Sequence, residues 1–208
     1  MEKLKSALSF GGILSEGDIT IIASAFQQRE LKSEEYFQEF GKIADKIAFL
    51  ENGILRVFST DERGDDVTKY FVRENQFFAD IISYYSAQPA TDAIQAVTPC
   101  KIFWIYFSAF EKLYAEIPNL NIFFKSISES TLLNKIKDND FLNFGNAKTK
   151  YGEFVRRYPV LAQQVPQQYI ASYLKITPQS LSRIRNELVK KSKISSYDGV
   201  PQPRNPGL

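Results

Sequence analysis

Polar side chains that can read DNA bases are grouped near the C-terminus. Gln179, Arg183 and Asn186 follow one another at spacings of four and three residues, so a helix would place them on one outer face. The amide groups of Gln and Asn can bind adenine through two hydrogen bonds, and an arginine guanidinium can bind guanine in the same way. This pattern is typical of a helix that lies in the major groove of DNA.

The side chains of this segment divide into two expected roles. We expect Gln179, Ser180 and Arg183 to contact bases. The others would mainly contact phosphates and set the register of the helix on the DNA; these are Thr177, Ser182, Arg185, Asn186 and Lys190. Contacts of basic side chains with phosphates supply affinity without sequence information.

Two short helices joined by a tight turn are expected to position these residues. The first, from about Gln167 to Leu174, carries an apolar stripe of Ile170, Ala171 and Leu174. Lys175 and Ile176 form the turn between the two helices.

The second helix begins at Pro178, which suits a first helical position, and Thr177 can cap it. It is expected to run to about Lys190. Its inner face is expected to carry Leu181, Ile184 and Leu188. A plain amphipathic hairpin with a solvated polar face is the alternative interpretation. The small Ala171, the tight turn, the cap and the basic exposed face together favour DNA recognition.

The charge of the chain is divided unevenly along its length. The net charge is +2 over 208 residues. From Lys148 onward there are eleven Lys and Arg against three Asp and Glu, whereas the first 147 residues carry fifteen against twenty-one. A basic C-terminal third on an acidic body favours contact of that third with a polyanion.

Composition excludes several functional classes. The chain has no histidine and one cysteine, Cys100, which argues against histidine-ligated zinc or haem, a cysteine-held cluster and histidine-based catalytic triads. There is no P-loop, GxSxG or GxGxxG motif, so we expect no enzyme, no metal and no cofactor. No apolar run reaches the roughly eighteen residues of a membrane span, and no secretion signal is visible. We therefore expect a cytoplasmic protein without a membrane partner.

The region from Arg29 to about Ile105 has the period of β-strands. Strand-like segments include residues 47–50, 54–58 and 68–72, and turn signals at residues 40–41, 51–53 and 61–65 separate them. Short strands at this spacing indicate an antiparallel sandwich or barrel. Before it, residues 1 to about 28 are expected to be helical, with Ser15 and Asp18 forming a capping box.

A longer helix is expected from Asn119 to Lys137, with a hinge at residues 137–140 and a further helix from Phe141 to Tyr158. The apolar residues of the Asn119–Lys137 helix recur at spacings of three and four. They could pack on the chain's own domain or form a subunit interface, and the pattern alone does not decide between these. After Lys193 the tail is rich in Pro and Gly, and irregular structure is expected there.

This order of elements resembles the Crp/Fnr superfamily of bacterial transcription regulators over nearly the whole chain. Gly53, Arg56 and Gly64 are similar to the family's hairpin pattern, and residues 170–188 are similar to its DNA-reading unit. The resemblance implies an α+β fold: a β-roll of eight antiparallel strands in residues 1–118, a dimerisation helix in 119–137, and a helix-turn-helix domain with a reduced wing in 138–208.

The resemblance also implies partners and roles. It implies a homodimer, joined through the Asn119–Lys137 helix, on a roughly palindromic duplex. Arg183 matches the position of a base-reading arginine, and Gln179 matches a glutamate that reads cytosine. In the wing region, residues 194–199 leave room for one short turn.

The effector region departs from the family pattern. Members that bind cyclic AMP carry Gly-Glu followed about ten residues later by Arg-Ser or Arg-Thr. Here Ala79-Asp80 and Ala90-Thr91 align with those pairs. Asp80 could accept a bond from a hydroxyl or be a solvated loop carboxylate, but Ala90 offers no charge to a phosphate.

We therefore expect a DNA-binding transcription regulator of Crp/Fnr type that cyclic AMP does not control. Its β-roll could hold an unknown small-molecule effector or none. The alternative is a small-molecule sensor whose output is a protein–protein contact.

Overall fold

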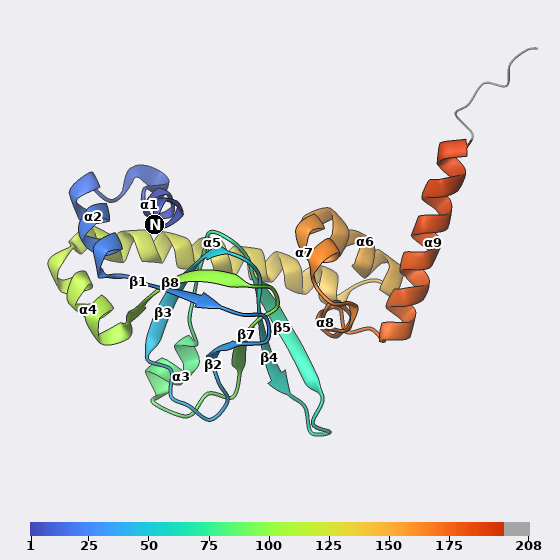
Figure 1. Cartoon of the computed structure of the whole chain (residues 1–208), viewed down its shortest axis with the longest axis horizontal. Coiled ribbons are helices and arrows are strands. Elements are labelled where there is room, and N and C mark those ends of the chain that lie inside the picture. The colour runs from blue at the N-terminus through green and yellow to red at the C-terminus, as the bar shows by residue number, and fades with distance from the viewer. Residues whose placement is uncertain (198–208) are drawn as a thin grey trace, which may run out of the picture.

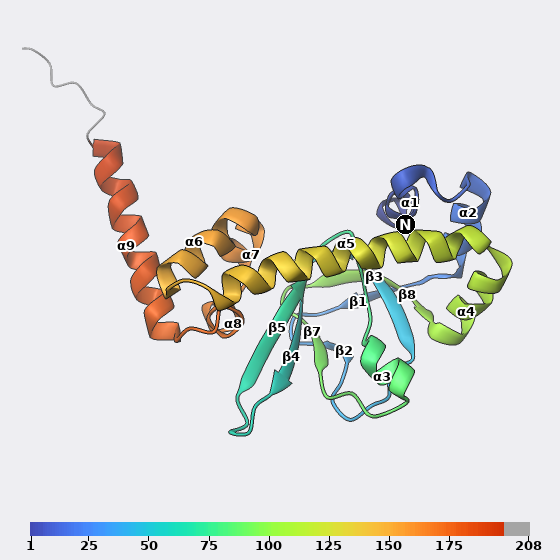
Figure 2. The same ribbon diagram turned by 180° about the vertical axis from the view of Figure 1, so that it is seen from behind.

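The molecule is elongated, with a β-roll at one end and a group of helices at the other (Figure 1). The computed structural model describes the backbone of residues 1–197 and the side chains of residues 1–188. One long helix, α5 (Pro118–Asn143), runs along the molecule and joins the two parts, as the view from behind also shows (Figure 2). The expected α+β class is confirmed.

Two short helices precede the β-roll and close one end of it. They are α1 (Glu2–Leu8) and α2 (Glu16–Ala25), with the 3₁₀ turn η1 (Phe10–Gly12) between them. The predicted capping box is present: the Ser15 hydroxyl accepts a bond from the Asp18 amide at 3.1 Å, and the Asp18 carboxylate accepts one from the Ser15 amide at 3.2 Å. Ile19 and Ile22 are buried, so α2 packs onto the roll through the face that carries them.

Eight antiparallel strands form the β-roll within the described part of the chain. They are β1 (Gln27–Leu31), β2 (Tyr36–Gln38), β3 (Lys46–Asn52), β4 (Leu55–Thr60), β5 (Asp66–Val72), β6 (Gln76–Phe78), β7 (Ala93–Ala96) and β8 (Cys100–Tyr106). They pair in two four-stranded sheets, in the orders β1-β8-β3-β6 and β2-β7-β4-β5. Leu50 and Ile102 from one sheet meet Leu55 and Ile94 from the other in a shared apolar core.

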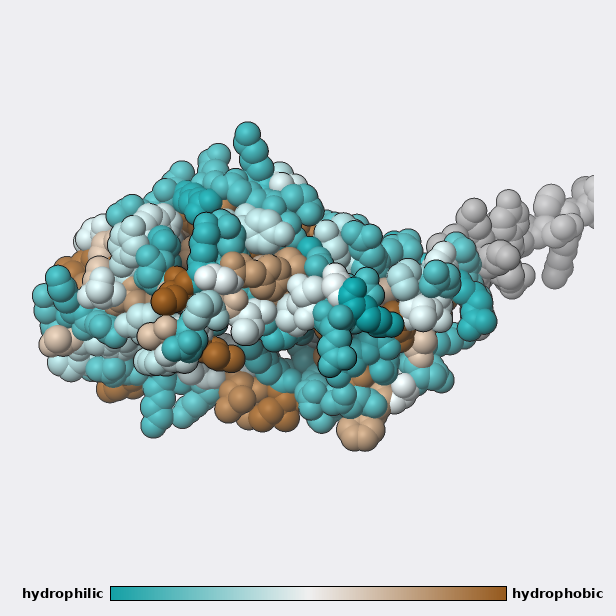
Figure 3. All heavy atoms as spheres, turned by 90° about the horizontal axis from the view of Figure 1, so that it is seen from below, coloured by the Kyte–Doolittle hydropathy of each residue, from teal (hydrophilic) through white to brown (hydrophobic). Residues whose placement is uncertain are grey.

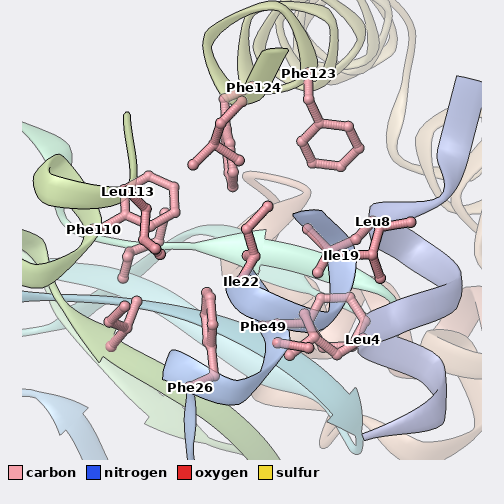
Figure 4. Close-up of a cluster of buried hydrophobic side chains, with 14 of the residues drawn as sticks. Leu4, Leu8, Ile19, Ile22, Phe26, Phe49, Phe110, Leu113, Phe123 and Phe124 are labelled. Atoms are coloured by element: carbon pink, nitrogen blue, oxygen red, sulfur yellow. The ribbon is translucent and has the colours of Figure 1, made fainter. Parts of the chain in front are cut away.

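Helix α3 (Ile81–Ser86) interrupts the strands, and α4 (Phe107–Glu116) follows the last of them. The first third of α5 packs onto this end of the roll. Phe123 and Phe124 are buried together with Phe110 and Phe49 in one cluster (Figure 4). Of the two possibilities left open for the long helix, packing on its own domain therefore holds for its N-terminal part.

The long helix continues through the predicted hinge. Residues 137–140 are helical. Helix α5 ends at Asn143, and the non-helical residues between α5 and α6 include Gly145. Gly145 has a φ of +95°, a value that favours glycine, and Asn146 caps the next helix by accepting a bond from the Thr149 amide at 3.0 Å. The hinge prediction was wrong because the polar side chain of Asp138 is bound within the protein.

The Asp138 carboxylate holds the C-terminal helices to α5. The Tyr158 hydroxyl donates to it at 2.6 Å, Tyr173 donates at 3.4 Å, and an Arg157 nitrogen lies 3.3 Å away. Burial, together with the Asp138 carboxylate, raises the pKa of Tyr158 to about 12. We call these four residues the Asp138 network.

Four helices make up the C-terminal part within residues 1–197: α6 (Ala147–Arg157), α7 (Pro159–Gln164), α8 (Gln167–Tyr173) and α9 (Pro178–Tyr197). The single helix predicted from Phe141 to Tyr158 is therefore split between α5 and α6. Helix α9 extends beyond the expected end near Lys190, so residues 194–197 are helical and not irregular. The remainder of the predicted tail and wing, residues 198–208, lies outside the described residues. None of the described helices is long and apolar enough to cross a membrane.

Gly53, at the turn between β3 and β4, lies where a side chain has no room. Its φ is +102°, and a Cβ atom there would lie 2.6 Å from both Cys100 Sγ and the Pro99 carbonyl oxygen. Gly64, in the next turn, also has a positive φ of +87°, but nothing lies within 4 Å of its Cβ position.

We expect Gly53→Ala to lower the free energy of unfolding by about 2–4 kcal/mol, because strain and overlap add. Gly64→Ala, the matched control, should cost about 1–2 kcal/mol from backbone strain alone. Urea unfolding followed by circular dichroism measures both. Equal losses in the two variants would contradict the close approach at Gly53.

Candidate functional site

Helices α8 and α9 meet at the turn that the sequence predicted. Lys175 takes a left-handed conformation with φ of +55°, and the Ile176 amide donates to the Ala171 carbonyl at 3.0 Å. Ala171 is completely buried, so a larger side chain there would push the two helices apart. Thr177 caps α9 as predicted, because its hydroxyl oxygen accepts a bond from the Ser180 amide at 3.1 Å.

The inner face of α9 is shorter than expected. Leu181 and Ile184 are buried against Ile170 and Leu174 of the preceding helix and turn. Leu188, which was expected on the same face, is 41% exposed. Helix α9 extends beyond its neighbours in the C-terminal part (Figure 1), and the packing therefore ends before Leu188.

The outer face of α9 brings together four of the predicted residues. Gln179, Ser182, Arg183 and Asn186 are all exposed and line one shallow concave surface. We call this surface the α9 face. Amide, hydroxyl and guanidinium groups are all available on it, so it can donate and accept hydrogen bonds along the edge of a ligand.

The other predicted residues lie elsewhere. Thr177 and Ser180 are bonded to each other at the cap, where the Thr177 hydroxyl donates to the Ser180 hydroxyl oxygen at 2.9 Å. Arg185 is half-buried on the flank of α9. Lys190 belongs to α9, but its side chain lies outside the described residues. The DNA contacts expected of these residues stay predictions.

Two residues that were not predicted as DNA contacts also line the α9 face. Gln167 comes from the start of α8, and Glu187 follows Arg183 by one helical turn on α9. Glu187 could have been found from its spacing of four from Arg183. Gln167 could not, because its place depends on how α8 crosses α9. Glu187 lies 4.0 Å from Lys148 of α6, which offsets its charge beside the α9 face.

The positions aligned with the nucleotide-binding pattern have structural roles of their own. The Asp80 carboxylate caps α3 by accepting a bond from the Ser83 amide at 3.0 Å, so Asp80 is a helix cap and not a free loop carboxylate. Ala90 is buried, and its amide donates to the Lys42 carbonyl at 3.1 Å. Thr91 is exposed, and Ala79 is half-buried against the core of the roll.

The Ser83 hydroxyl closes this region further. It accepts a bond from the Ala44 amide at 3.0 Å and donates to the Gln88 carbonyl at 2.6 Å. The loop around α3 is therefore held by the chain's own hydrogen bonds.

A groove of about 630 Å³ lies beside this region, between β5, β6, α1, α5 and the C-terminal helices. Phe77, Tyr70 and Tyr173 give it an aromatic lining, and Ser130, Thr131 and Asn134 of α5 face it with polar groups. The Lys135 ammonium lies 3.9 Å from the centre of the Tyr70 ring. Burial, aided by the Asp92 and Asp80 carboxylates, raises the pKa of Tyr70 to about 12.

We expect Asp80→Ala to lower the free energy of unfolding by about 0.5–2 kcal/mol, which is the usual cost of losing an N-cap. Thr91→Ala serves as the control, because Thr91 is exposed and should change stability by less than about 0.5 kcal/mol. Chemical denaturation measures both. An unchanged stability for Asp80→Ala would show that the cap contributes nothing.

A comparison with protein-family models gave a match to part of the chain. Residues 28–116 match the cyclic nucleotide-binding domain. A search of curated protein sequences found no match to the chain.

Several solved structures are similar over most of the chain. FixK2 from Bradyrhizobium japonicum is 16% identical and has a TM-score of 0.65; the match covers 80% of this chain and 86% of FixK2. The c-di-GMP responsive global regulator CLP from Xanthomonas campestris is 13% identical with a TM-score of 0.66, over 92% of this chain and 96% of CLP.

The catabolite activator protein of Thermus thermophilus is 17% identical with a TM-score of 0.54, over 89% of this chain and 88% of that protein. Residues 28–116 thus match the family model of the cyclic nucleotide-binding domain, and the chain shares its fold with these three proteins over most of its length.

Proposed function

We propose that this protein is a sequence-specific DNA-binding transcription regulator of Crp/Fnr type, that it acts as a homodimer, and that cyclic AMP does not control it. The observation that carries the proposal is the α9 face. A capped helix, held from behind by Leu181 and Ile184, presents Gln179, Arg183 and Asn186 to solvent on one side. CLP, which has a similar fold, is described as a global regulator that links cell–cell signalling to virulence gene expression, and this supports the proposal.

Dimerisation is supported by the middle of α5. Every residue from 128 to 137 is exposed, and they include Leu132, Leu133 and Ile136, which are 58%, 58% and 51% exposed. A helical stretch whose residues are all largely exposed gains little stability from packing on its own domain. Leu132, Leu133 and Ile136 lie within one and a half helical turns of each other, which suits pairing of this short apolar patch with α5 of a second copy. Hydrophobic patches interrupt the otherwise mostly hydrophilic surface seen from below (Figure 3).

Independence from cyclic AMP is supported by the aligned positions in the β-roll. The Asp80 carboxylate already accepts the hydrogen bond at the start of α3, and Ala90 presents no charge. A phosphate placed there would meet a carboxylate and lack a cationic partner, which costs several kcal/mol for a buried charge. Calorimetric titration with cyclic AMP should give no binding heat, and micromolar binding would refute this part.

Selection of bound duplexes from a random pool at near-physiological salt tests the proposal as a whole. Enrichment of a two-fold symmetric site is expected, with affinity that falls steeply as salt is raised. If no sequence is enriched and binding to DNA is equally weak on all duplexes, the protein–protein alternative gains support.

Arg183→Ala should weaken binding to the selected site by about 1–3 kcal/mol, or roughly 5- to 150-fold in Kd, and relax base preference at one position. Arg185→Ala is the control, because the half-buried Arg185 lies on the flank of α9 and should weaken all duplexes alike. Fluorescence anisotropy on the selected and scrambled duplexes separates the two. A uniform loss for Arg183→Ala would make it a phosphate contact.

Leu133→Glu combined with Ile136→Glu should raise the dimer Kd about 100-fold or more, because two apolar side chains lose their burial. Sedimentation velocity measures the change. Ile21→Glu is the matched control, since Ile21 is also 51% exposed but belongs to α2 and not to the exposed stretch of α5. A dimer that survives the double substitution would place the subunit interface elsewhere.

A further inference from the structure

Helix α8 lies along the free edge of one sheet of the β-roll. Strand β5 is the last strand in the order β2-β7-β4-β5, so its outer backbone groups have no neighbouring strand. The Ser172 hydroxyl of α8 binds two of these backbone groups. It accepts a hydrogen bond from the Thr68 amide at 2.9 Å and donates one to the Asp66 carbonyl at 3.1 Å. A side chain of α8 therefore satisfies the sheet edge.

A stacked arginine reinforces this edge. The Arg56 guanidinium, from β4, lies between the rings of Phe58 and Tyr169, with 3.8 Å to each ring centre. It is held in place by bonds to the Gln95 and Asp66 side chains, both 2.8 Å long. Tyr169 belongs to α8, so its ring covers a buried cation of the β-roll. We call the contacts of Tyr169 and Ser172 with the roll the sheet-edge contact.

The sheet-edge contact is only partly satisfied. Among side chains of residues 1–188, Arg56 Nη1 and Thr68 Oγ1 are the buried polar atoms without a hydrogen-bond partner, and both residues belong to this edge. Separation of α8 would let water reach both atoms. The contact therefore positions α8 and can also be released.

The orientation of α9 follows that of α8. Ile170, Ala171 and Leu174 pack with Leu181 and Ile184 in one cluster, so the two helices move as a unit. The Asp138 network attaches this unit to α5, but Phe144, Gly145 and Asn146 between α5 and α6 leave a short non-helical link. The sheet-edge contact is a further attachment of this unit to the β-roll, beside the apolar contact of Ile54, Phe71 and Val97 with the same cluster, and it restricts rotation of the unit about the end of α5.

We propose that Tyr169 and Ser172 are positioning residues that fix the direction of α9 relative to the dimer axis, and so determine which spacing between two half-sites on DNA is accepted. This inference rests on the proposed function. Each added base pair moves a half-site along the duplex and turns it about the DNA axis, so a fixed pair of α9 helices fits one spacing only. A pair that can turn fits several.

The test compares the full-length protein with Tyr169→Ala/Ser172→Ala on duplexes whose half-sites are separated by the selected number of base pairs, or by one or two more or fewer. We expect the unchanged protein to prefer one spacing by about tenfold or more, and the double variant by about twofold or less. Base preference within each half-site should stay the same in both. Tyr169→Phe is the control, because it keeps the ring over Arg56.

An unchanged spacing preference in a folded double variant would overturn the positioning role while leaving the proposed function intact. Failure of the unchanged protein to select any duplex would overturn the proposed function, and the spacing role with it. Should the double variant not fold, Ser172→Ala alone replaces it, and its spacing preference is judged in the same way. Hydrogen exchange at the Thr68 amide reports the contact without DNA: exchange should be slow in the unchanged protein and faster in Ser172→Ala, and equal rates would overturn the inference.

Discussion

The packing of Phe123 and Phe124 against the β-roll is the contact on which the placement of everything downstream depends. Both rings are buried, and both meet Phe77 edge to face, at 6.3 and 5.1 Å between ring centres. Burial of each such side chain contributes roughly 1.5–3 kcal/mol, so the first third of α5 is part of the core of the roll. Because α5 is unbroken to Asn143, the direction set by these rings reaches its far end. The exposed stretch of residues 128–137 lies between this packing and the Asp138 network near the other end of α5.

Two of the polar contacts that attach the C-terminal helices differ in what their loss would cost. Removal of the Asp138 carboxylate would leave the hydroxyls of Tyr158 and Tyr173 without their acceptor in a mostly buried site, and each such group costs about 1–3 kcal/mol. Release of the sheet-edge contact removes an unsatisfied polar atom instead of creating one, because water can then reach the unpaired Nη1 nitrogen of Arg56. Separation of the C-terminal helices from the β-roll should therefore begin at the sheet-edge contact. The helices would then turn about the end of α5 and stay attached to it through the Asp138 network.

Local signals in the sequence predicted the elements around the α9 face, and tertiary contacts decided the rest. The Thr177 cap and the spacing of Leu181 and Ile184 depend on residues within one or two helical turns, so they could be read directly. Asp138 was misjudged as part of a hinge because its partners lie 20 and 35 residues away along the chain. Leu188 has the right spacing for burial, but whether a neighbouring helix reaches it depends on where that helix ends. The division of the chain into a β-roll, a dimerisation helix and a DNA-binding domain stays a prediction.

The cap at Asp80 is a local feature that the sequence did carry, since Asp followed three residues later by Ser is a common start of a helix. The structural role of this cap depends on Ser83, which it holds in place. Asp80 accepts the Ser83 amide, and Ser83 in turn bridges two backbone segments, so the loop holds its shape without a ligand. An external anion would have to displace a carboxylate that is part of the chain and therefore always present at high effective concentration. It would also have to do so without a cation at Ala90. The four residues aligned with the nucleotide-binding pattern therefore include a helix cap and a buried alanine, whose roles in the fold explain these residue types without a ligand contact.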